Sequence, residues 1–157
     1  MKPVEPGHFR SVMGNFATGV TVVTATGPAG PVGMTANAVA SLSLDPLLLL
    51  VAFDNTARTL SVVRTTERFG VNVLAAGQEE LARLFASKEP EAAKFAGVPH
   101  SVYDGLPVID GTLGWVGCRL ERLLDGGDHT IVTGRVLELG TGSGSPLVFV
   151  DGEYRSL

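Results

Sequence analysis

Two long β-type segments separated by three turn residues are the strongest constraint on how this chain can fold. The segments TLGWVGCRLERLLD (112–125) and HTIVTGRVLEL (129–139) are rich in β-branched and apolar residues, and Gly126, Gly127 and Asp128 join them. Glycine and aspartate in so short a connection predict a β-hairpin, whose strands are antiparallel. We therefore expect an antiparallel sheet to form at least part of the core.

Shorter runs elsewhere in the chain have the same β character. β-branched or apolar residues fill the segments 20–26, 32–39, 47–53, 69–74 and 147–150. The run LLLLVAF (47–53) is expected to be a strand buried on both faces, or at least on most of its surface. The segment 97–111 contains two prolines and three glycines and is expected to be a loop.

Helical patterns are few and short. Apolar spacing predicts helices at about 7–15, within 54–66 and at 78–87, and Pro90 is expected to begin another. Such helices cannot cover both faces of a doubly wound parallel sheet. The predicted fold is mainly β, an antiparallel barrel with short helices at its ends, in one domain over residues 1–157.

Composition excludes several functional classes. The formal net charge is −4 with the cations scattered, so no nucleic-acid partner is expected. Cys118 is the only cysteine and is predicted to be a buried, inert thiol, and the three histidines form no metal-binding pattern. The run 47–53 is too short to span a bilayer, and residues 1–6 lack a signal-peptide core, so a soluble cytoplasmic protein without a membrane partner is expected.

The segment GMTANAVASLSLDP (33–46) consists almost wholly of small and hydroxylated residues between two apolar runs. Small side chains allow a flat ligand to approach the backbone, and strand-edge N–H and C=O groups could then bond the polar rim of a heterocycle. The side-chain donors would be Thr35, Asn37, Ser41 and Ser43. Taken by itself, the composition suits a tight crossing of two strands slightly better.

The next segment, DNTART (54–59), favours a ligand. Asp54, Asn55 or Thr56 could cap a helix whose first N–H groups stay free, and Arg58 would lie in the first turn, where the helix dipole disfavours a cation. A cation beside free N–H groups suits a phosphate, although a solvated surface arginine is the simpler alternative. Together the two segments predict a ring beside a strand and a phosphate beside a helix start.

Four stretches together resemble the short-chain NAD(P)H:flavin reductase family, the reductase components of two-component flavin-dependent monooxygenases. They are FATGVTVVTA (16–25), GMTANAVASLSLDPLLLL (33–50), FGVNVL (69–74) and GDHTIVTGRV (127–136). The resemblance runs from about Phe9 to Tyr154 in the family's order. It implies an FMN-binding split barrel that works as a homodimer, binds FMN or FAD near the subunit interface and takes hydride from NADH or NADPH. The chain departs from the family at Ala38 and Ala40, where Ser or Thr is common, and in having only Pro46 where two prolines are usual.

The resemblance also implies roles for particular residues. The flavin ring would lie along Met34, Thr35, Ala36, Asn37 and Ala38, with Ser41 and Ser43 toward the ribityl and phosphate part. That chain and the phosphate would be held by Asp54, Asn55, Thr56, Arg58 and Thr59, with Phe85 and Lys88 nearby. NAD(P)H would contact Gly152, Glu153, Tyr154 and Arg155. His129 would be the catalytic residue facing the nicotinamide, unless it merely caps the 126–128 turn through Asp128 or the backbone.

The implied reaction is hydride transfer from C4 of the nicotinamide to N5 of the flavin, with reduced flavin diffusing to a partner monooxygenase. Because the cofactors carry this chemistry, the chain needs no catalytic triad. Two alternatives stay open, a split-barrel oxidase that retains its flavin and a non-catalytic flavin-binding module. The residues distinguish neither FMN from FAD nor NADH from NADPH, and they do not identify the partner's substrate.

Overall fold

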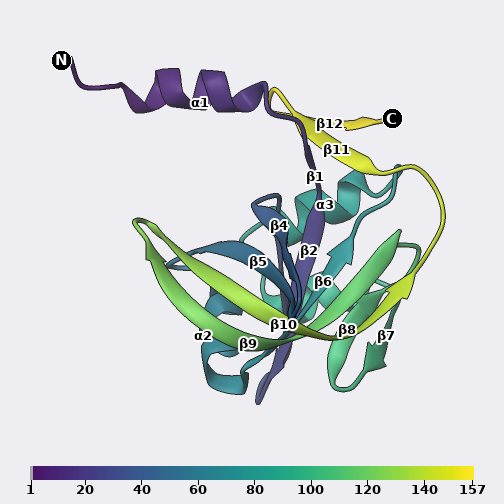
Figure 1. Ribbon diagram of the computed structural model, residues 1–157. Helices are drawn as coiled ribbons and strands as arrows, with labels where there is room; N and C mark the ends of the chain where they lie inside the picture. The colour runs from purple at the N-terminus through teal and green to yellow at the C-terminus, as the bar shows by residue number, and fades with distance from the viewer. Residues whose placement is uncertain (1) are drawn as a thin grey trace.

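The computed structural model describes residues 2–157, in which antiparallel strands predominate (Figure 1). The helices are α1 (Pro6–Gly14), α2 (Arg58–Thr66), α3 (Glu79–Ala86) and α4 (Glu91–Ala96). The first strands are β1 (Thr18–Gly19), β2 (Thr21–Gly27), β3 (Gly30–Ala36), β4 (Val39–Leu44), β5 (Leu47–Asp54) and β6 (Arg68–Val73). The others are β7 (His100–Tyr103), β8 (Leu106–Ile109), β9 (Gly114–Gly126), β10 (His129–Thr141), β11 (Leu147–Val150) and β12 (Glu153–Ser156). The predicted mainly β, antiparallel fold with short helices is confirmed.

The predicted hairpin over residues 112–139 is confirmed and forms the middle of the main sheet. That sheet has seven strands in the order β3-β2-β6-β9-β10-β5-β4. β9 and β10 pair from His129 opposite Gly126 to Thr141 opposite Gly114. Gly127 adopts φ +79° in the turn, a conformation that glycine reaches without steric cost.

The two edges of this sheet are consecutive in the chain. β3 and β4 stand at opposite ends of the strand order, yet only Asn37 and Ala38 separate them. Ala52 N–H donates to the carbonyl oxygen of Ala38 at 2.9 Å, so the chain crosses from the β3 edge to the β5 side at this point. The sheet therefore curls upon itself, and the segment 33–46, which is rich in small residues, lies where its two edges approach.

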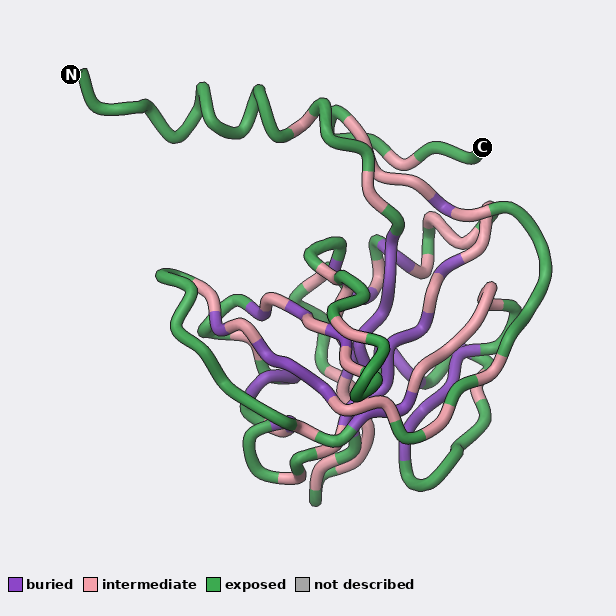
Figure 2. Tube along the Cα trace, viewed as in Figure 1, coloured by how far each residue is buried: buried purple, intermediate pink, exposed green. Residues whose placement is uncertain are grey.

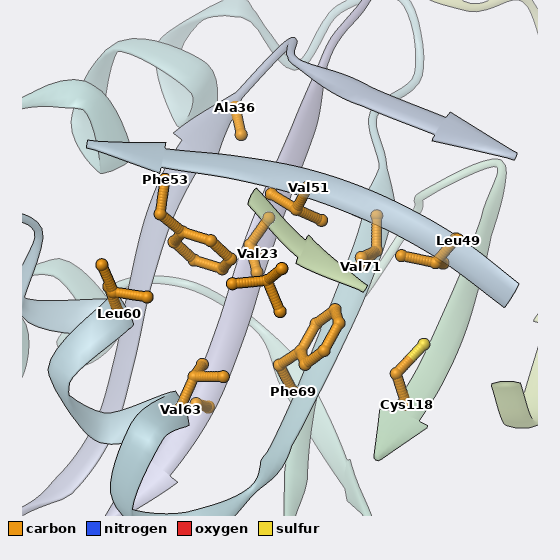
Figure 3. Close-up of a cluster of buried hydrophobic side chains, with 12 residues drawn as sticks. Val23, Ala36, Leu49, Val51, Phe53, Leu60, Val63, Phe69, Val71 and Cys118 are labelled. Carbon is orange, nitrogen blue, oxygen red and sulfur yellow. The ribbon is translucent and has the colours of Figure 1, made fainter. Parts of the chain in front are cut away.

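β2 carries buried side chains on both faces from Thr21 to Ala25 and runs through the centre of the molecule (Figure 2). On one face, Val23 and Ala25 join a cluster from β5, β6 and α2, in which the Phe53 and Phe69 rings meet edge to face with centroids 6.4 Å apart (Figure 3). On the other face, Val20 and Val22 pack with residues of α3 and α4. Two hydrophobic clusters thus share one strand.

Two local expectations were wrong. β5 alternates, with Leu49, Val51 and Phe53 buried and the residues between them partly exposed, because only its inner face meets the core. The supposed loop 97–111 contains a hairpin of β7 and β8. Its turn residues, Asp104 and Gly105, have φ +46° and +79°, the Asp-Gly hairpin pattern that the prolines and glycines around it obscured.

α1 extends away from the rest of the molecule (Figure 1). Its expected apolar stripe is present but faces outward, with Phe9 61% exposed and Phe16, just beyond the helix, 68% exposed. No helix among residues 2–157 combines the length and the apolar character needed to cross a membrane.

Gly134 lies where β10 passes closest to Phe69. A methyl group there would overlap the Phe69 ring and stand 2.9 Å from Cβ of Cys118. We predict that Gly134→Ala lowers the free energy of unfolding by about 1–3 kcal/mol, because the packed core must shift to admit it. Urea denaturation measures the change, with Gly97→Ala as the matched control because nothing lies within 4 Å of its new Cβ. Equal midpoints for the two variants would contradict the prediction.

The Cys118 side chain is fully buried, as predicted, and burial raises the pKa of its thiol from 9.0 to about 12, against a smaller opposing effect of Arg68. We expect no labelling by a disulfide reagent at pH 8 until urea unfolds the chain. The folded protein keeps this proton above pH 9, whereas the unfolded chain releases it. The thiol therefore favours unfolding progressively as pH rises from 9 toward 12. Rapid labelling without urea would disprove the expectation.

Candidate functional site

Three hollows follow one another around the meeting point of β3 and β4. The cationic cavity, of about 520 Å³, lies between β3, the start of α2 and the α3–α4 region. The bridging cavity, of about 130 Å³, lies between Thr35, Asn37 and Tyr154. The arm cavity, of about 670 Å³, lies between the α1–β1 segment and β4–β5. Thr35 borders the first two and Asn37 the last two, so the three cavities are neighbours.

The cationic cavity brings together residues predicted from distant parts of the sequence. Its walls include seven of the expected cofactor residues: Met34, Thr35, Thr56, Arg58, Thr59, Phe85 and Lys88. Its volume is in the range of small-molecule sites. Arginine and lysine side chains on its walls give it the electrostatic character of an anion site.

The free edge of β3 supplies backbone groups to this cavity. Gly33 N–H points away from β2 and donates to Oε2 of Glu91 at 3.0 Å. Because polar groups alternate in direction along an antiparallel edge strand, Thr35 presents its N–H and C=O on the same side. The Thr35 hydroxyl donates to the carbonyl oxygen of Ala82 at 2.6 Å, which fixes its side chain against α3.

Gly33 is also the point at which the helices come closest to β3. A Cβ there would lie 2.8 Å from Cε1 of Phe85 and 3.3 Å from Cζ of Phe95. Those rings, one from α3 and one from α4, meet edge to face with centroids 5.1 Å apart. The bare backbone of Gly33 therefore lets both helices lie directly against the strand.

The start of α2 differs from the prediction in its cap. The N-cap is Ala57, with no side-chain hydrogen bond, and Asp54 instead accepts from the Thr56 N–H and hydroxyl at 2.7 and 2.6 Å. The Thr56 hydroxyl, then its N–H, and to a smaller extent His129, lower the pKa of Asp54 below its ordinary value. The helix start nevertheless borders the cationic cavity, so its N–H groups suit an anion there.

Arg58 is tied to the opposite wall. Its Nη2 donates to the carbonyl oxygen of Glu89 at 2.8 Å and lies 3.2 Å from Oε1 of Glu91, while its side chain is 51% exposed. These contacts offset the unfavourable position of a cation at a helix start.

Asn55 and His129 lie together at the tip of the β9–β10 hairpin and do not line the three cavities. Asn55 Nδ2 donates to Gly127 O at 3.0 Å and its Oδ1 accepts from Thr130 at 2.7 Å, so its side chain holds the hairpin. His129 Nδ1 is 2.7 Å from Oδ1 of Asp128, the contact expected if it caps the turn, and leaves Nε2 for a ligand. The His129 side chain is 42% exposed.

The C-terminal hairpin places Tyr154 against the site. The Tyr154 ring is 5.2 Å from that of Phe149 and lies under the Arg83 guanidinium at 5.0 Å. It shares the bridging cavity with Thr35 and Asn37. The neighbouring tail residues Gly152, Glu153 and Arg155 are exposed, and the last two form an ion pair at 2.9 Å.

Three predicted contacts are not supported by the geometry. The Ala36 side chain packs into the hydrophobic core, its carbonyl oxygen accepts from Thr21, and the residue lines none of the three cavities. Ser41 and Ser43 line a separate apolar cavity of about 270 Å³ beneath β4. The reason is the crossing at Asn37 and Ala38, which carries the chain to the other edge of the sheet.

Two charged residues of the cationic cavity were missed. Glu91 and Lys94 lie one turn apart on α4 and both line the cavity, Lys94 with only 3% of its side chain exposed. Their spacing is readable in the sequence, but it is equally common on solvated helix faces.

Comparisons with known proteins show the family of the chain. The profile described as "Flavin reductase like domain" matches residues 13–157. The chain is 37% identical to HsaB, the reductase subunit of a flavin-dependent monooxygenase of Mycobacterium tuberculosis, over 98% of this chain and 83% of that protein. It is 41% identical to the FMN reductase (NADH) SmoA of Agrobacterium fabrum, over 93% and 83% of the two chains.

Solved structures of related proteins have the same fold as this chain. The NADH:FAD oxidoreductase SgcE6 of Streptomyces globisporus superposes with a TM-score of 0.91 at 38% identity, over 99% of this chain and 96% of that chain. Component B of nitrilotriacetate monooxygenase from Mycobacterium thermoresistibile has a TM-score of 0.91 at 38% identity, over 96% and 86%. The resemblance seen in the sequence is confirmed: the chain belongs to the flavin reductase-like family and is an oxidoreductase of the flavin reductase class.

Proposed function

We propose that the protein transfers hydride from NADH to N5 of FMN or FAD and releases the reduced flavin to a separate flavin-dependent monooxygenase. The observation that carries this proposal is the cationic cavity, where the β3 edge, a helix start and three cations share one space. The relatives support NADH as the donor, since SmoA and SgcE6 are both described as NADH enzymes. HsaB, described as the reductase subunit of a monooxygenase, supports the partner.

In this proposal the phosphate end of the flavin lies in the cationic cavity and the ring follows the β3 edge toward Asn37. The donors present fit such a molecule, because the Thr35 backbone groups suit a heterocycle's polar rim and Arg58 and Lys88 suit a phosphate. The bound flavin supplies the hydride acceptor. The chain's part is to hold the two rings face to face and to exclude water from them.

His129 and Tyr154 are the proposed contacts of the nicotinamide side. The bond between Nδ1 of His129 and Asp128 fixes the imidazole orientation, so Nε2 is positioned for a ligand. Tyr154 is held between Phe149 and Arg83 beside Asn37, where it would limit the second ring's approach.

We further propose a cytoplasmic homodimer of one-domain subunits. The apolar stripe of α1 adjoins the arm cavity, which Met13 and Phe16 line. The large apolar side chains of this segment are 46–68% exposed, and monomeric proteins rarely expose contiguous apolar patches. A second copy would cover both. The sharing of β2 by both hydrophobic clusters supports one domain, and the single buried thiol suits a reducing compartment.

An NADH assay tests the main proposal. NADH mixed with the purified protein should be consumed at a rate that rises with added FMN or FAD, and NADPH should be tested in parallel. Samples without flavin or without protein are the controls. A protein that keeps a tightly bound flavin and consumes no NADH would instead support the oxidase or the binding module.

We predict that His129→Ala lowers kcat/KM for NADH about tenfold, the value of one lost hydrogen bond to the substrate. Circular dichroism should be unchanged, since the histidine is partly exposed. His8→Ala is the matched control because His8 is exposed on α1. If both variants turn over like the unaltered protein, His129 has only its turn-capping role.

A further inference from the structure

Lys94 is an unusual side chain for a surface helix. Only 3% of the Lys94 side chain is exposed, yet the residue lines the cationic cavity. Lysine is almost never buried to this extent unless its charge is paired. Its Nζ lies 3.5 Å from Oε1 of Glu91, which is longer than the distance typical of a charge-assisted hydrogen bond. An ammonium has three donors, and this contact takes at most one of them.

Glu91 connects three elements around the same cavity. Its Oε2 accepts from Gly33 N–H at 3.0 Å, and its Oε1 lies between Arg58 Nη2 at 3.2 Å and Lys94 Nζ at 3.5 Å. Only 14% of its side chain is exposed. One carboxylate therefore holds two cations, one from α2 and one from its own helix, against the free edge of β3.

The charges on the cavity walls match a phosphate monoester. Arg58, Lys88 and Lys94 contribute three positive charges and Glu91 one negative charge, so the walls keep two positive charges in excess. A phosphate monoester carries between about −1.5 and −2 at pH 7.

We propose that Lys94 binds the flavin phosphate directly, and that Glu91 is a positioning residue that competes with the phosphate for Arg58 and Lys94. This inference rests on the proposed function. It assigns Glu91 the task of holding the cations in place while limiting their affinity for the phosphate. Such a limit suits an enzyme whose reduced flavin must leave, because a cofactor bound by unopposed cations would dissociate slowly.

The test compares FMN with riboflavin, which is the same ring system without the phosphate. Dissociation constants of both are measured by flavin fluorescence for the unaltered protein, Lys94→Met, Lys94→Arg and Glu91→Gln. Lys2→Met is the matched control, because Lys2 is exposed near the N-terminus. Circular dichroism establishes that each variant is folded.

Lys94→Met should weaken FMN binding about tenfold to a hundredfold, as expected for a lost hydrogen bond between charged groups, and should leave riboflavin binding unchanged. Lys94→Arg should retain most of the preference for FMN. Glu91→Gln keeps a carbonyl oxygen for Gly33 N–H but removes the competing charge, so it should bind FMN more tightly with riboflavin unaffected.

Equal weakening of FMN and riboflavin in Lys94→Met would overturn the inference, because it would show a structural role only. If Lys94→Met does not fold, Glu91→Gln decides: a stronger preference for FMN supports the inference, and an unchanged or weaker preference refutes it. NADH consumption by the unaltered protein is read separately. If the unaltered protein consumes NADH but the variants keep its preference for FMN over riboflavin, this inference alone is refuted. If the unaltered protein consumes no NADH, the proposed function is refuted.

Discussion

The burial of β2 on both of its faces is the constraint on which the rest of the structure depends. A strand that must bury both faces needs a sheet curled around one of them and a cover over the other. The curled sheet with α2 provides the first, and α3 and α4 provide the second. Because β3 is paired to β2 and lies at an edge, the covering helices also meet that edge. The cationic cavity therefore lies where the helices that cover β2 meet the edge of β3.

The polar groups of the site are held by the same arrangement. Asn72, fully buried in β6, donates to Val22 O at 3.2 Å and accepts from Ile109 N–H at 2.9 Å, so β2, β6 and β8 are joined where no water reaches. Buried amides satisfied in this way fix the relation between strands. β3 is paired to β2 from Gly30 to Ala36, so its outer edge presents backbone donors from a strand that the sheet already orders.

Local patterns in the sequence predicted those features that local physics decides. The 126–128 turn and the helix at 78–87 depend on neighbouring residues, and both were placed correctly. The clustering of Arg58 and Lys88 was anticipated from the family resemblance, and the cavity brings them together. The Asp104-Gly105 hairpin was readable in principle, but its strands have only four residues each and Pro107 interrupts the pattern.

Other features depend on which distant segments meet, and no local pattern records that. Asn55 was expected to bind a ligand, but it faces a hairpin tip more than seventy residues later in the chain. The family resemblance implied that Ser41 and Ser43 lie toward the ribityl and phosphate part, but the chain changes sheet edge between Asn37 and these serines. Glu91 reaches Gly33 across 58 residues, a contact that only the packing of α4 on β3 creates.

The lack of a side chain at Gly33 has a consequence for how this enzyme could change. Because the Phe85 and Phe95 rings occupy the space of a Cβ, even one methyl group would push α3 and α4 outward and carry Lys94 and Glu91 with them. The absence of a side chain at Gly33 therefore helps to set the width of the cationic cavity. Substitution of the exposed Lys88 can change ligand preference without disturbing the packing, whereas almost any substitution at Gly33 would displace the two helices.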